Sequence, residues 1–246
     1  MGEACCNINL RYNHDNNMKH GKKYRAVVEK FDKYKTYSLE EAIKFLKENK
    51  IAKFDESVEV HIKTSVDPKK TDQQLRGTTE LPHGTGKTKR VVVITTTHAA
   101  DAKAAGADEV VGDEFIEKIK SGKAFVGKDM FDVLVATPEM MPKLAPVAKI
   151  LGPKGLMPNP KTETVTTKIK ETVAALKRGK VAFKNDNGAI VHQVVGKLSF
   201  EDVKLIENIA SFISSLEKFK PTKSKGKLII GISISSTMGV GMKVTI

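Results

Sequence analysis

The chain has 246 residues, of which 40% are hydrophobic, and it carries a formal net charge of +13. This length fits one large domain or two small ones, and no apolar run approaches the roughly 18 residues of a membrane-spanning helix. The basic excess favours an anionic partner, most often nucleic acid or an acidic membrane surface, and a chain whose only cysteines are the adjacent Cys5 and Cys6 has no disulfide framework and fits a reducing compartment.

The first part of the chain predicts an extension, a helix and two strands. Residues 1–17 lack hydrophobic periodicity, and we expect them to form a disordered extension before the basic segment that starts at Met18. Ser38 and Glu41 have the spacing of a capping box, which predicts the start of a helix. SVEVHIKTSV at 57–66 alternates between apolar and polar residues and predicts a half-buried strand, and QLRGTTEL at 74–81 predicts another.

The segment LPHGTGKTKR at 81–90 resembles part of a phosphate-binding loop. That motif needs a glycine where this chain has Leu81, and it needs a helix after Lys87 and Thr88. The β-branched run RVVVITTT at 90–97 predicts a strand instead. The segment therefore favours a glycine-rich connection, and a nucleotide-hydrolysing enzyme is the weaker alternative.

From residue 90 onward, predicted strands alternate with predicted helices. The strands are nearly all apolar, at 90–97, 108–111 and 131–138, and the helices follow them at 98–107, 113–122 and 139–151. Prolines break or kink the last helix. This alternation predicts a parallel sheet covered on both faces. No Gly-x-Gly-x-x-Gly follows any of the strands, so the layer is Rossmann-like without the dinucleotide fingerprint.

After residue 160 the pattern is again one of amphipathic helices and alternating strands. Helices are predicted at 166–179 and 200–219, and strands at 180–185, 189–199, 227–235 and 241–246. The Asp-Asn-Gly sequence at 186–188 predicts a hairpin between its two flanking strands. An α+β pattern that brackets an α/β insert predicts two domains, the first of them split in sequence.

The chain contains no recognisable catalytic constellation. His83, His98, Asp101 and Asp108 lie near one another in sequence, but their spacing matches no metal site. A nucleophile elbow and a His-Glu-x-x-His motif are also missing. We therefore expect no enzymatic activity, no catalytic residue, no cofactor and no metal.

The segment ILGPKGLMPNPKTETVT at 150–166 resembles the signature of the bacterial ribosomal protein L-one family, the stalk proteins of the large ribosomal subunit. Four further segments resemble the same family in the same order. They are MKHGKKYRA at 18–26, the stretch from AKFDESVEV to LPHGTGK at 52–87, FKNDNGAIVHQVVGK at 183–197 and SISSTMGVGMKV at 233–244. The resemblance thus covers the chain from Met18 to its end.

The resemblance implies two domains and a hinge. It implies a split α+β RNA-binding domain I at 18–83 and 160–246, and an inserted Rossmann-like three-layer α/β/α domain II at 84–159. It also makes LPHGTGK a connection between the domains and not a nucleotide site. The implied hinge residues are His83, Gly84, Pro158, Asn159 and Pro160.

The resemblance also implies RNA contacts at two places in domain I. Small hydroxyls, a glycine that permits close approach and exposed apolar groups suit RNA, which is read largely by shape, 2′-hydroxyls and splayed bases. Asn187 stands where the family commonly has a basic residue, which weakens the expectation of a phosphate contact there. The expected RNA-binding residues are Lys53, Phe54, Asn185, Asp186, Ser235, Ser236, Thr237, Met238 and Gly239.

The function implied by the resemblance is that of a structural protein of the large subunit. Its expected partners are ribosomal RNA at the mobile stalk, deacylated tRNA leaving the exit site and the mRNA of its own operon, which it represses. We expect no membrane partner, a monomer when free and a cytoplasmic ribosome, with an organellar ribosome as the alternative. An RNA-binding regulator that never enters the ribosome is the rival interpretation.

Overall fold

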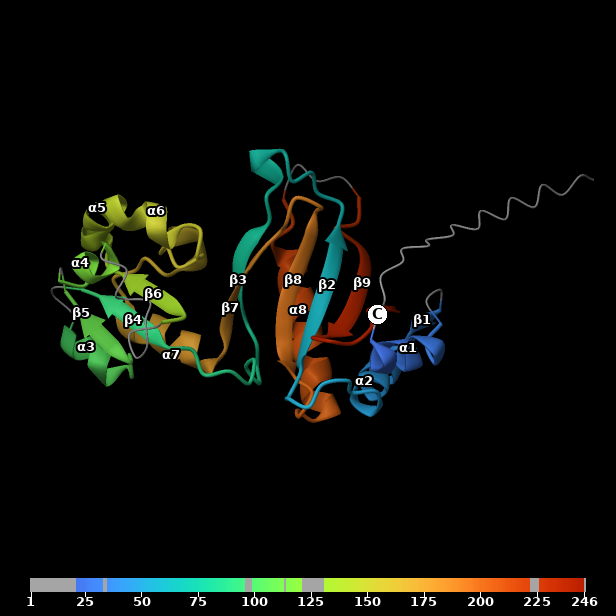
Figure 1. Cartoon of the computed structure of the whole chain (residues 1–246). Helices are drawn as coiled ribbons and strands as arrows, with labels where there is room; N and C mark the ends of the chain where they lie inside the picture. Colours follow the sequence, from blue (N-terminus) through green and yellow to red (C-terminus); the bar gives the residue numbers. More distant parts are fainter. Residues whose placement is uncertain are drawn as a thin grey trace, which may run out of the picture.

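A computed structural model describes residues 21–32, 35–95, 99–112, 114–120, 131–221 and 226–245. The extension expected at 1–17 lies outside these residues. The chain has a mixed α/β fold with three sheets (Figure 1). No helix among the described residues is long and apolar enough to cross a membrane.

The largest sheet has five strands in the order β1-β10-β9-β2-β8. Its strands are β1 (Thr36–Tyr37), β10 (Met242–Val244), β9 (Ile229–Ser236), β2 (Ser57–Thr64) and β8 (Ile190–Lys197). Only the β1–β10 pair is parallel. The alternation predicted along β2 is confirmed, because Val58, Val60 and Ile62 are fully buried while the residues between them are not.

Three helices accompany this sheet: α1 (Lys22–Glu29), α2 (Leu39–Glu48) and α8 (Asp202–Lys218). The capping box predicted for α2 is confirmed, since Ser38 Oγ accepts a hydrogen bond from the Glu41 amide at 3.2 Å. Leu205, Ile209 and Phe212 of α8 are fully buried in the same core as the sheet. Figure 1 shows α8 behind the strands, so that the other side of β8, β2 and β9 carries no helix in that view.

A separate antiparallel ribbon consists of β3 (Arg76–Glu80) and β7 (Lys180–Lys184). The hairpin predicted between β7 and β8 is wrong in its pairing, because β7 pairs with β3 along its length and meets β8 only at the bridge between Asn185 and Val191. Phe183 explains this choice. Its ring packs edge-on against Phe212 and Phe219, which anchors β7 to α8.

The third sheet is parallel, as predicted, and its strand order is β5-β4-β6. Its strands are β4 (Val91–Ile94), β5 (Glu109–Val111) and β6 (Val133–Ala136). The elements between and after them are α3 (Ala99–Ala104), α4 (Glu114–Lys120), η4 (Pro138–Met140), α5 (Met141–Leu144), η5 (Ala145–Val147) and α6 (Ala148–Leu151). The short 3₁₀ and α pieces from 138 to 151 confirm the helix broken by prolines.

Helix α7 (Ile169–Arg178) packs on the parallel sheet, although it was expected to belong to domain I. Its buried residues Ile169, Val173 and Leu176 share a cluster with Val91 and Val135 of the sheet. Val165 also forms a parallel bridge with Ala136 at the end of β6. The apolar face of α7 is therefore buried by the parallel-sheet part of the chain and not by the α8 core.

The chain passes between the α8 core and the two hydrophobic clusters around the parallel sheet at Gly84 and Gly179, which touch each other. A Cβ on Gly179 would lie 2.5 Å from Gly84 Cα, and both glycines have positive φ, +64° and +123°. Asn208 of α8 holds the first connecting segment, since its side chain accepts a hydrogen bond from the His83 amide and donates one to Gly84 O. All buried residues of the α8 core lie outside 85–178, and those of the two clusters around the parallel sheet lie inside it.

The other expected hinge residues lie at a short turn around residue 160. Asn159 begins the 3₁₀ turn η6 (Pro160–Thr162), and its side chain accepts from the Lys161 amide at 2.9 Å. Pro158 precedes this turn. The turn contacts β3, and the neighbouring Glu163 pairs with Lys180. The segment 158–163 thus lies against the β3–β7 ribbon and does not itself link the two parts of the chain.

Candidate nucleic-acid interface

Two loops at one end of β2 bring exposed apolar side chains close to the sheet. The Ser57 amide donates to Thr237 Oγ1 at 2.9 Å, and the Thr237 amide donates to Ser57 O at 3.0 Å. Phe54 and Met238, on these two loops, are 54% and 53% exposed. Large apolar groups exposed in this way on a basic surface suit stacking on bases or sugars. Lys53 beside Phe54 is also exposed.

Glu56 lies between the two loops, and the sequence interpretation missed it. Its carboxylate is fully buried and accepts hydrogen bonds from the amides of Ala52 at 2.7 Å and Ile51 at 3.2 Å. Burial acts to raise the pKa of Glu56, but the Ser236 hydroxyl and the facing backbone amides, including that of Met238, lower it below its ordinary value. The signal was available, because residue 56 has the same parity as the buried residues of β2.

Ser236 and Gly239 have structural roles in this arrangement. Ser236 is only 5% exposed and lies near Glu56, so its side chain offers little surface to RNA, and its expected RNA contact stays a prediction. A Cβ on Gly239 would lie 2.3 Å from Ser236 Oγ, which is far inside van der Waals contact. The glycine is therefore needed for the turn itself, whatever approaches it from outside.

Asn185 and Asp186 lie at the opposite end of the sheet. In the register of β2, Lys63 pairs with Ile190 whereas Ser57 pairs with Lys197, so the two ends are about 20 Å apart at 3.3 Å per residue. Asn185 is 5% exposed and accepts from the Leu75 amide at 3.1 Å. This burial leaves little of the side chain for RNA, and the expected contact stays a prediction.

Asp186 remains exposed and organises the turn that follows it. Its Oδ1 accepts from the amides of Gly188 and Ile190, both at 2.8 Å. The hydrogen bond from the Ile190 amide is the main reason why the pKa of Asp186 is lowered. The structure thus divides the expected RNA-binding residues into two groups, at the two ends of one sheet.

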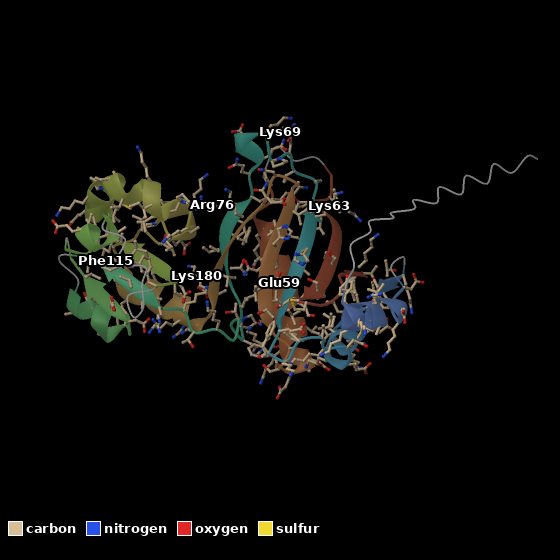
Figure 2. All side chains as sticks on the ribbon, viewed as in Figure 1. Glu59, Lys63, Lys69, Arg76, Phe115 and Lys180 are labelled. Atoms are coloured by element: carbon tan, nitrogen blue, oxygen red, sulfur yellow. The ribbon has the colours of Figure 1, made fainter. Side chains whose placement is uncertain are left out.

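The side of β8, β2 and β9 that faces away from the core joins these two ends, and we call it the open face. Figure 2 shows Glu59 and Lys63 along β2, with Arg76 on the neighbouring ribbon. None of its members is buried, and they are drawn from all three strands: Glu59, His61, Lys63, His192, Ser233 and Ser235. Ser235, one of the expected RNA-binding residues, is therefore in the middle of a polar surface.

Basic side chains outnumber acidic ones around the open face. Lys63 lies on it, and Lys243 of β10 is opposite Ser233 in the register of the sheet. Arg76 and Lys184 occupy opposite positions on the two strands of the ribbon beyond β8. All four are exposed. Against them stand Glu59 and Asp186. A surface with this balance attracts a polyanion and does not suit a basic partner.

A cleft of about 470 Å³ lies between the ribbon and the parallel-sheet part of the chain. Its charged lining is mostly basic, but Lys87 pairs with Asp132 at 3.3 Å and Lys89 Nζ donates to Lys180 O at 2.8 Å. Burial is the main reason why the pKa of Lys89 is lowered. The nearby glycine-rich segment does not open a helix, since β4 begins at Val91, so the prediction against a phosphate loop is confirmed.

Among the described residues, no group of three or more histidine, cysteine, aspartate or glutamate side chains could hold a metal ion. The fold and the open face together define a class, that of basic α/β proteins with an exposed polar sheet surface. The chain belongs to the Ribosomal protein L1p/L10e family, whose profile matches residues 46–240. Members of this family are structural proteins of the ribosome and not enzymes.

Curated relatives agree with this assignment along nearly the whole chain. The Mesoplasma florum protein is 47% identical over 225 residues, which cover 92% of this chain and 97% of the relative. The Kosmotoga olearia and Chlamydia trachomatis serovar D proteins are each 46% identical, with 92% of this chain and 96% of each relative covered. Each of the three is named "Large ribosomal subunit protein uL1".

Proposed function

We propose that this chain is a component of the large ribosomal subunit that binds ribosomal RNA of the mobile stalk through the open face and the two adjoining loops. The relatives' names support the ribosomal role. The observation that carries the RNA-binding role is the position of exposed Phe54 and Met238 beside a sheet face flanked by four basic side chains. Apolar side chains stack on unpaired bases, while basic ones neutralise phosphates.

The distribution of groups favours a folded RNA over a uniform duplex. The deep major groove of an RNA helix excludes side chains, so proteins recognise RNA through loops, splayed bases, 2′-hydroxyls and phosphate positions. The open face offers hydroxyls, imidazoles and the carboxylate of Glu59, with exposed Phe54 and Met238 at one end. Such a mixed surface requires a partner whose phosphates and bases are presented at defined places.

The proposal includes two structural units. Residues 21–84 and 179–245 form the RNA-binding unit, and residues 85–178 form a Rossmann-like unit that the chain enters and leaves at Gly84 and Gly179. The two units are joined by only two chain segments, which meet at the touching glycines Gly84 and Gly179. This connection allows the second unit to move as a rigid body. We propose that this movement assists release of deacylated tRNA from the exit site, and that the open face also binds the chain's own operon mRNA and represses its translation.

The test is a binding titration with the stalk fragment of large-subunit ribosomal RNA and a scrambled duplex of equal length. Both are measured at about 0.15 M salt and at several-fold higher salt, where nonspecific phosphate attraction weakens. Binding to the stalk fragment that persists when the duplex no longer binds is the expected result. Equal, salt-sensitive binding to both RNAs contradicts the proposal. Sedimentation with large subunits then separates a ribosomal component from a free RNA-binding regulator.

A further inference from the structure

Two histidines meet in the centre of the open face. His61 of β2 and His192 of β8 occupy paired positions in the sheet, and their Nδ1 atoms are 2.8 Å apart. On the other side of His61, its Nε2 lies 2.9 Å from Ser235 Oγ of β9. His192 Nε2 lies 3.5 Å from Asp186 Oδ2. A continuous row of polar contacts thus runs from Asp186 through His192 and His61 to Ser235.

The contact between the two rings limits how many protons the pair can hold. At 2.8 Å one Nδ1 must donate a hydrogen and the other must accept it, so at least one imidazole is neutral. Burial, followed by the charge of His192, lowers the pKa of His61, and Glu59 opposes this shift. If both rings were protonated, two N–H groups would point at each other. The doubly protonated pair is then stable only if the two rings move apart and a hydrogen-bond acceptor enters between them.

The groups around the pair supply no acceptor between the rings. Glu59 and Lys63 flank His61 on its own strand, while Asp186 contacts His192 on the side away from His61. Ser233 and Ser235 are the neighbours on β9, with Lys243 on the strand beyond it. Arg76 and Lys184 lie past β8 on the ribbon. The cations outnumber the two carboxylates, so the surroundings favour an anion from outside the chain.

We propose that His61 and His192 form a phosphate contact within the RNA interface, in which one phosphodiester accepts a hydrogen bond from each imidazolium, so that RNA binding takes up a proton. This inference rests on the proposed RNA-binding function. A phosphodiester has two nonbridging oxygens, one for each ring, and its charge stabilises the second proton. The proton comes from solvent, and it is released when the RNA dissociates.

The sign of the pH dependence follows from this linkage. The RNA-bound pair has the higher proton affinity, so binding is strongest at low pH and weakens as the pH rises through the pKa of the bound pair. One extra proton gives a limiting slope of about −1 for the logarithm of affinity against pH. Between about pH 6 and pH 8, the affinity for RNA is expected to fall about tenfold.

The experiment measures binding of the stalk RNA fragment to the full chain from about pH 5.5 to about pH 8 at constant ionic strength. The variants are His61→Gln and His192→Gln, with His83→Gln as the matched control, since His83 pairs with Glu207 away from the open face. Calorimetry in two buffers of different ionisation enthalpy counts the protons taken up. Thermal unfolding verifies that each variant is folded.

The expected result is a pH-dependent affinity in the wild type and the His83→Gln variant, and a flatter profile with less proton uptake in both open-face variants. A wild-type affinity that stays constant with pH, or a slope that both open-face variants retain, overturns the inference while leaving RNA binding intact. Failure of the wild type to bind the stalk fragment at any pH refutes the proposed function itself, and the inference falls with it.

Discussion

Replacing Glu56 by Gln tests whether one buried carboxylate organises the proposed RNA-binding loops. The glutamine has nearly the same shape, so no cavity forms. Its single oxygen can still accept from the amides of Ile51 and Ala52, but those bonds lose the carboxylate charge. Hydrogen bonds to a charged group stabilise by roughly 1.5–3 kcal/mol and neutral ones by roughly 0.5–1.5. Two such losses lower the free energy of unfolding by about 2–3 kcal/mol.

A further cost arises on the other side of the same group. The glutamine places an NH₂ group where Oε2 of Glu56 now lies near the amide of Met238 and the hydroxyl of Ser236. Two donors that face each other loosen the contact between the loops. The exposed positions of Phe54 and Met238 then become less defined, and we expect RNA to dissociate faster from the variant.

The pH dependence of stability provides a second readout. Because the pKa of Glu56 is lowered in the folded chain, its contribution is present above the ordinary value of 4.5 and is lost as the pH falls through the folded-state pKa. The difference in stability between wild type and Glu56→Gln should therefore be largest at neutral pH and shrink in acid.

Denaturant unfolding at neutral and acidic pH measures both quantities, and Glu48→Gln, at an exposed position at the end of α2, serves as the matched control. The control should change stability by less than about 0.5 kcal/mol. A Glu56→Gln variant as stable as this control at neutral pH refutes the reasoning. So does a destabilisation that stays the same in acid.

Three substitutions extend this reasoning. Phe54→Ala should weaken stalk RNA binding by about 1–3 kcal/mol in a titration while the unfolding midpoint stays unchanged, and Phe54→Tyr should bind normally. Gly239→Ala should weaken both stability and RNA binding because its Cβ would lie 2.3 Å from Ser236 Oγ, and adding Ser236→Ala should restore part of the stability in a double-mutant cycle. Gly179→Ala combines a φ of +123° with a Cβ 2.5 Å from Gly84 Cα, so denaturant unfolding should show that the free energy of unfolding falls by more than about 1 kcal/mol. An unchanged midpoint would mean that the two connecting segments separate easily.

Local signals in the sequence predicted the local structure well. The Ser38–Glu41 capping box, the alternation along β2 and the apolar strands of the parallel sheet all appear as expected. These features depend on residues that are close in sequence or on a periodicity that one segment carries by itself. They therefore required no knowledge of what packs against what.

The predictions that failed depended on distant partners. The turn at 186–188 is typical of a hairpin, but Phe183 packs against α8 and directs β7 to β3, more than a hundred residues earlier. Helix α7 has an ordinary apolar face, and its sequence cannot say which of two cores buries it. The two histidines meet only because β2 and β8 are neighbours, which no spacing between residues 61 and 192 indicates.

The position of α7 makes one prediction that separates the expected domain boundary from the one that we propose. Deleting 84–159 would keep α7 but remove the sheet that covers Ile169, Val173 and Leu176. An uncovered apolar helix face favours aggregation. Deleting 85–178 removes both clusters around the parallel sheet and keeps the α8 core whole.

The junction of the second deletion needs no linker. A Cβ on Gly179 would lie 2.5 Å from Gly84 Cα. Because a Cβ is about 1.5 Å from its own Cα, the two Cα atoms are at most about 4 Å apart, close to the roughly 3.8 Å that a trans peptide spans, so a direct Gly84–Gly179 bond can close the gap. We expect the shorter chain to be a soluble monomer by gel filtration that unfolds cooperatively and binds stalk RNA, and the 84–159 deletion to aggregate. If the shorter chain folds but does not bind, the removed unit contributes to the RNA interface directly. If instead the 84–159 deletion is the soluble one, α7 belongs to the RNA-binding unit and the boundary at Gly179 is wrong.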